Sequence, residues 1–76
     1  MLIQDIRYDF ISGAVSECRI MWDGNSCSLS AYYETDNKWV TLSRKRRGVR
    51  LFDSVERAMI VAAEIGFNCV TLLQKQ

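Results

Sequence analysis

The hydrophobic and polar residues of this chain alternate over several short stretches, the pattern of β-strands with one buried face. The first stretch, residues 4–10, places Ile6, Tyr8 and Phe10 on one side and charged residues on the other. A helix that begins at Leu2 and buries Ile6 and Phe10 fits the same segment. The sequence therefore leaves strand and helix open here, and the alternation favours a strand.

Three further strands are predicted over residues 17–22, 27–34 and 38–43. The Asp23-Gly24 pair tolerates the positive φ angles that a tight hairpin turn requires, so it predicts a turn between the strands over residues 17–22 and 27–34. Polar residues 35–37 supply the next turn. The spacing predicts a meander of consecutive antiparallel strands.

The alternation also predicts which side chains face outward. Met21 and Tyr32 fall opposite the apolar series of their strands, so we expect both on an exposed face. Tyr33, next to Tyr32, then belongs to the core. Trp39 fits a buried and an exposed position equally well.

A helix is predicted between Asp53 and Gly66, because Asp53 and Glu56 have the spacing of a capping box and Gly66 suits a left-handed C-cap. A last strand is expected over residues 68–73. The predicted buried stripe of the helix is Val55, Ala58, Met59, Ala62 and Ile65.

These elements predict a single α+β domain over residues 1–76, with an antiparallel sheet of four to five strands and one helix packed on one face. The chain has 76 residues, at the small end of what folds alone, and 49% of them are apolar, which is enough for a core. No stretch approaches the ~20 consecutive apolar residues of a membrane span. The N-terminus turns charged at Asp5 and does not resemble a signal peptide, so we expect no membrane contact and a cytoplasmic location.

Composition argues against an enzyme. The chain has no histidine, the usual general base near neutral pH, and its four glycines form no phosphate-binding loop. Asp5 and Asp9 would lie about 13 Å apart along a strand, too far for paired acid–base chemistry. The three cysteines, Cys18, Cys27 and Cys69, lack the short spacings of metal and redox sites. We therefore expect reduced core thiols, no cofactor, no metal and no catalytic residue.

The charge of the chain is concentrated in one segment. Five of the ten basic residues lie within positions 44–50, and the rest of the chain carries five basic against nine acidic groups, a balance of −4. Such asymmetry bears on partners and not on fold. These basic residues are Arg44, Lys45, Arg46, Arg47 and Arg50.

Three interpretations of this basic cluster stay open. It could contact nucleic-acid phosphates, with nearby aromatic residues stacking on bases. It could dock on an acidic protein surface. It could also be a solvated link between strand and helix. The acidic remainder of the chain favours a two-signed protein interface, because a free-standing nucleic-acid binder of this length is usually more basic overall.

The segments Leu51–Ala58 and Ala62–Phe67 resemble a feature of small plasmid- and phage-encoded accessory proteins, in which a capped, Ala-rich helix and Ile-Gly-Phe precede a final strand. The resemblance covers about a third of the chain and transfers no functional residue. It implies a mobile-element protein, a class that includes partition and transfer accessories and anti-CRISPR inhibitors. Many anti-CRISPR proteins are acidic DNA mimics, and the basic cluster departs from that pattern.

Two hypotheses follow. The chain is a non-catalytic interaction protein that docks on, and modulates or inhibits, a protein complex that handles nucleic acid, or it binds nucleic acid directly through the basic cluster. A homodimer paired through a sheet edge is compatible with both. The candidate partner-binding residues are Arg44, Lys45, Arg46, Arg47, Arg50, Tyr32 and Met21.

Overall fold

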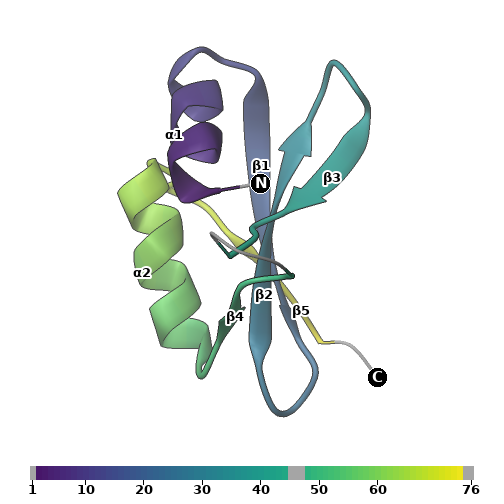
Figure 1. Ribbon diagram of the computed structural model, residues 1–76, viewed down its shortest axis with the longest axis vertical. Helices are drawn as coiled ribbons and strands as arrows, with labels where there is room; N and C mark the ends of the chain where they lie inside the picture. Colours follow the sequence, from purple (N-terminus) through teal and green to yellow (C-terminus); the bar gives the residue numbers. More distant parts are fainter. Residues whose placement is uncertain (1, 45–47, 75–76) are drawn as a thin grey trace.

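The computed structural model describes residues 2–44 and 48–74. Two helices and five strands follow one another in this part of the chain (Figure 1). They are α1 (Ile3–Ile11), β1 (Val15–Trp22), β2 (Cys27–Tyr33), β3 (Lys38–Thr41), β4 (Leu51–Phe52), α2 (Val55–Ile65) and β5 (Thr71–Gln74). Within the described residues, neither helix is long and apolar enough to cross a membrane.

The five strands form one mixed sheet with the order β3-β2-β1-β5, and β4 also pairs with β2. All pairs that involve β2 are antiparallel, whereas β1 and β5 are parallel. The α+β class is confirmed, but the expectation of a purely antiparallel sheet is wrong. The reason is the α2 crossover. β4 and β1 both run antiparallel to β2, and a helical crossover from β4 delivers β5 in the same direction as β4 and β1.

The N-terminal segment is a helix, so the predicted strand over residues 4–10 is wrong. Ile6 is completely buried, and Ile3 and Phe10 pack against the core, as residues three and four apart do on one helical face. Tyr8, which a strand would place beside Ile6, is 72% exposed. Both α1 and α2 therefore cover the sheet, on the same side (Figure 1), where one helix was expected.

Two long-range contacts hold α1 in place. The Arg7 guanidinium donates hydrogen bonds to the backbone carbonyl oxygen of Glu64 in α2, with an Nη2–O distance of 2.8 Å. The Tyr33 hydroxyl donates to the Asp9 carboxylate. These contacts satisfy polar groups that the strand interpretation leaves on a solvated surface.

The second helix begins one residue later than expected. Ser54, not Asp53, is the N-cap, and its hydroxyl accepts a hydrogen bond from the Arg57 backbone N–H at 3.3 Å. The prediction that Met59 is buried is wrong, because its side chain is 51% exposed; Val61, which the predicted stripe left out, is buried. The buried residues of α2 are Ala58, Val61, Ala62 and Ile65.

The C-cap of α2 confirms the role predicted for Gly66 and adds a close contact. Gly66 has a φ of 126°, and a Cβ atom at this position would lie 2.7 Å from the Phe10 ring. Phe67 packs edge-on against Phe10, with ring centroids 4.7 Å apart. The end of α2 and the end of α1 are thus fastened to each other by aromatic packing.

We predict that Ile6→Ala lowers the free energy of unfolding by about 2–5 kcal/mol, because it empties a fully buried site. The matched control Tyr8→Ala is expected to change stability by less than about 0.5 kcal/mol, since its side chain is exposed. Urea denaturation followed by circular dichroism measures both. Equal losses for the two variants would contradict the helix and support a strand.

Candidate interaction site

A basic hairpin lies between β3 and β4. The two short strands share one edge of β2: β3 pairs with residues 30–33, and β4 pairs with residues 27–28. Leu42, just after β3, still donates its N–H to the Leu29 carbonyl oxygen at 2.8 Å. The described residues between Leu42 and β4 pair with each other and not with β2.

Backbone contacts close the stem of this hairpin. Ser43 and Val49 form an antiparallel bridge. Arg44 donates its N–H to the Gly48 carbonyl oxygen at 3.0 Å, and Arg50 donates to the Leu42 carbonyl oxygen at 2.9 Å. We call this stem, residues 42–44 and 48–50, the basic hairpin. The candidate residues Lys45, Arg46 and Arg47 lie outside the described residues.

The two described arginines of the basic hairpin differ in their surroundings. Arg44 is exposed. Arg50 is half-buried, and its guanidinium carbon lies 5.1 Å from the centroid of the Phe52 ring. The structure therefore brings both arginines to the base of the hairpin, with Arg50 held against β4 by a cation–π contact.

The sheet face opposite the helices is not covered by any element of the described chain (Figure 1). Strand registers place Leu51 beside Ser28, and Thr71 and Leu73 beside Arg19 and Met21. We call this surface the open face. Its residues are Glu17, Arg19, Met21, Ser28, Ser30, Tyr32, Trp39, Thr41, Leu51, Thr71 and Leu73.

The outward orientation predicted for Met21 and Tyr32 is confirmed, because both side chains lie on the open face, where each is partly buried. Trp39, whose side the sequence left undecided, lies there too, beside Tyr32. The structure does not gather all candidate residues into one surface. Arg50 is directed to the helix side of the sheet, where it contacts Phe52.

The centre of the open face is a stack of three side chains. The Arg19 guanidinium carbon lies 4.1 Å from the centroid of the Trp39 ring. The ring centroids of Tyr32 and Trp39 lie 5.2 Å apart, and the two ring planes meet at 53°. The Tyr32 hydroxyl donates a hydrogen bond to the Asn37 side-chain oxygen in the adjoining turn. A guanidinium on a tryptophan ring is a favourable cation–π geometry. The stack is preorganised by its own contacts.

Small side chains on β2 make this stack possible. Arg19 pairs with Ser30 on β2, and the Trp39 ring lies one strand further, on β3. The Ser30 and Thr41 hydroxyls hydrogen-bond at 3.1 Å and form a low polar floor beside the stack. The Nε atom of Arg19 is buried and has no hydrogen-bond partner within residues 2–44 and 48–74.

An apolar area adjoins the stack on the open face. Leu51 is 51% exposed, Val49 45% and Leu73 39%. Leu51, Val49 and Met21 line a shallow cavity of about 260 Å³ near the β1–β2 turn. Sequence reasoning missed Arg19, Leu51 and Leu73 as site residues. The alternation of β1 already placed Arg19 outward, whereas the pairings of Leu51 and Leu73 depend on tertiary register.

The buried titratable groups belong to the covered side of the sheet. Burial raises the pKa of the Cys18 thiol to about 11. Burial, and then the charge of Asp23, raises the pKa of Cys27. The pKa of Tyr33 is also raised, mainly by burial and to a smaller extent by the hydrogen bond to Asp9. Cys69 is exposed, so the expectation of three core thiols is wrong for that residue.

In residues 2–44 and 48–74, no group of three or more metal-ligating side chains comes together. Comparisons with protein-family models, with curated proteins and with solved structures found no match. The open face and the basic hairpin are therefore interpreted from their own geometry.

We predict that Arg19 and Trp39 are coupled by about 0.5–1 kcal/mol in a double-mutant cycle of Arg19→Met and Trp39→Leu, because the cation–π contact is partly exposed. Urea denaturation of the single and double variants gives the coupling energy. A matched cycle of Lys38→Met with Trp39→Leu is the control. Coupling no larger than in the control would show that the stack does not form in solution.

Proposed function

We propose that this protein is a non-catalytic interaction module that docks through its open face on a protein of a nucleic-acid-processing complex, and modulates or inhibits that complex. The observation that carries the proposal is the stack of Arg19, Trp39 and Tyr32 on a sheet face that no element of the described residues covers. The sequence resemblance supports a protein encoded by a mobile element, and a cytoplasmic location is part of the same proposal.

The composition of the open face supports protein docking. Tryptophan, tyrosine, arginine and methionine are enriched at the centres of protein interfaces, and truncating such residues typically costs the most binding energy. The open face supplies all four residue types, together with half-exposed Leu51 and Leu73. The Ser30 and Thr41 hydroxyls hydrogen-bond to each other, so a docked partner can cover them without leaving either hydroxyl without a hydrogen bond.

The geometry favours a protein over nucleic acid as the occupant of this face. A base-stacking platform presents free ring faces to successive bases. Here Arg19 lies over Trp39, and Tyr32 leans on the same ring. Glu17 also lies on the open face, and a carboxylate repels a phosphate backbone. A surface that carries both positive and negative charges together with aromatic side chains suits a protein partner.

The basic hairpin gives direct nucleic-acid binding a place as the second candidate function. Arg44 is exposed, so a phosphate can reach its guanidinium group. The two functions use different residues, so variants separate them.

We predict that Trp39→Ser reduces capture of the partner from host extract at least tenfold, because it removes the centre of the open face. The matched control is Ile60→Ser, which alters a 59% exposed residue on α2. Affinity capture with quantitative mass spectrometry, before and after nuclease treatment, measures the retained protein.

The expected result is one protein that survives nuclease treatment, is kept by Ile60→Ser and is lost with Trp39→Ser. Capture that is unchanged by Trp39→Ser would contradict docking through the open face. Capture that nuclease abolishes, and that Arg44→Glu weakens, would support direct nucleic-acid binding instead.

A further inference from the structure

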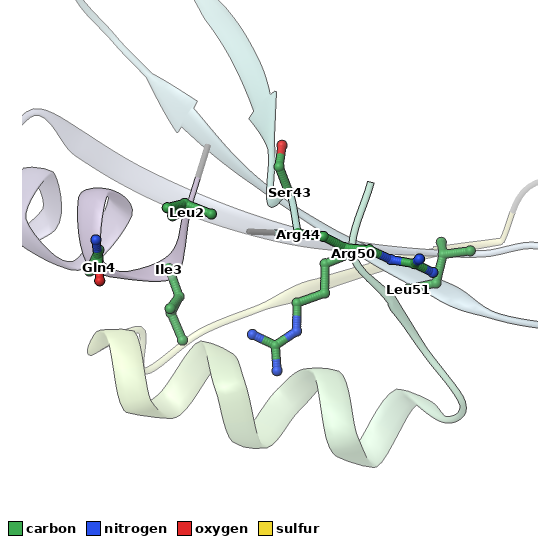
Figure 2. Close-up of a pocket in the computed structure, with 7 residues that line it drawn as sticks. All are labelled: Leu2, Ile3, Gln4, Ser43, Arg44, Arg50 and Leu51. Atoms are coloured by element: carbon green, nitrogen blue, oxygen red, sulfur yellow. The ribbon is translucent and has the colours of Figure 1, made fainter. Parts of the chain in front are cut away.

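Two cavities share one arginine, Arg50. The first has a volume of about 470 Å³ and lies between the start of α1 and the basic hairpin, with Arg44 and Arg50 among its lining residues (Figure 2). The second, of about 410 Å³, lies against α2 and is lined by Arg50 and Arg57. Because Arg50 belongs to both, we treat them as one surface and call it the arginine groove.

The arginine groove is positively charged along its length. Arg44, Arg50 and Arg57 line it, and no carboxylate is among the lining residues that the structure describes. Figure 2 shows the Arg50 guanidinium reaching toward α2, and Arg50 is among the lining residues of both cavities. Guanidinium groups bind phosphate oxygens bidentately, and unneutralised arginines concentrate anions.

The walls of the groove are apolar. Leu2 and Ile3 form the α1 side of the first cavity, and Phe52, Ile60 and Val61 form much of the second. Phe52 already carries the Arg50 guanidinium, and Ile60 is 59% exposed. An inorganic anion would leave these apolar side chains in contact with water. A ligand with an apolar or aromatic body would cover them and gain the free energy of burying apolar surface.

The first turn of α1 adds donors to the charged end. Leu2, the N-cap, supplies no side-chain hydrogen bond, and the first backbone N–H groups of a helix have no intrahelical acceptor. The N–H groups of Ile3 and Gln4 therefore add to the positive potential that the arginines create, and Asp5, the acidic residue of the same turn, is not among the lining residues of the cavity. The volume of the first cavity also lies within the range of about 300–1,000 Å³ typical of small-molecule sites.

We infer that the arginine groove binds a phosphate ester that carries an aromatic body, that is, a nucleotide, either free or as part of a single strand. Arg44 and Arg50 hold the phosphate, and the apolar walls contact the base or sugar. The arginine groove and the open face share Leu51 at their border, but Arg44, Arg50 and Arg57 lie only in the groove, so variants of these arginines test the inference separately from docking through the open face.

The test is a titration of the ¹⁵N-labelled full chain with 5′-AMP, followed by amide chemical shifts at about 50 mM salt. The expected result is saturable shifts at Ile3, Arg50 and Arg57, with none at Tyr32 or Trp39. The Arg44→Gln variant, changed at an exposed position, should weaken binding about tenfold, the loss of one charge-assisted contact. Arg44→Gln with Arg50→Gln should abolish it.

The charge-matched controls are Arg19→Gln and Lys38→Gln, which remove the same charge elsewhere and should keep the affinity. Inorganic phosphate should bind much more weakly than 5′-AMP. An eight-residue oligothymidylate that shifts the same amides, where 5′-AMP does not, would assign the phosphate ester to a single strand. No saturable shift with either nucleotide probe, or equal weakening by the controls, would overturn the inference.

Discussion

Both helices cover the same face of the sheet, and the rest of the structure depends on this one-sided covering. The covered face is apolar: Ile20 on β1 and Leu29 and Ala31 on β2 are almost completely removed from water. Their burial supplies the main driving force for folding, at roughly 25 cal/mol per Å² of apolar surface. The opposite face can then carry arginine, serine, threonine and aromatic residues without weakening the core, and it is free for a partner.

The long edge of β2 is the second determinant. It is paired by β3 over one half and by β4 over the other. The described residues between these two strands form the basic hairpin, which is paired with itself. The same arrangement sets Leu51 on the open face and turns Arg50 toward Phe52 and the helices. The pairing of β3 and β4 with one edge of β2 therefore places residues on both the open face and the arginine groove. This explains how a chain of 76 residues can present two candidate surfaces.

Local patterns predict the parts of the fold in which one period dominates. The alternation of β1 and β2 correctly assigned Met21 and Tyr32 to the outward face. The N-terminal segment fits two periods, and its helix is selected by contacts with Glu64 and Tyr33, which lie 57 and 24 residues away from their partners. The direction of β5 and the Arg19–Trp39 contact depend on strand order and register, which a single sequence does not display locally.

The most direct test of the account is photo-crosslinking from each side of the molecule. Tyr32, on the open face, is replaced by benzoyl-phenylalanine, and Met59, 51% exposed on α2, is replaced in a parallel variant. Both variants are irradiated in host extract after nuclease treatment. The account predicts a discrete crosslinked protein from position 32 and none from position 59. A crosslink from position 59 alone would place the partner on the helices and contradict docking through the open face.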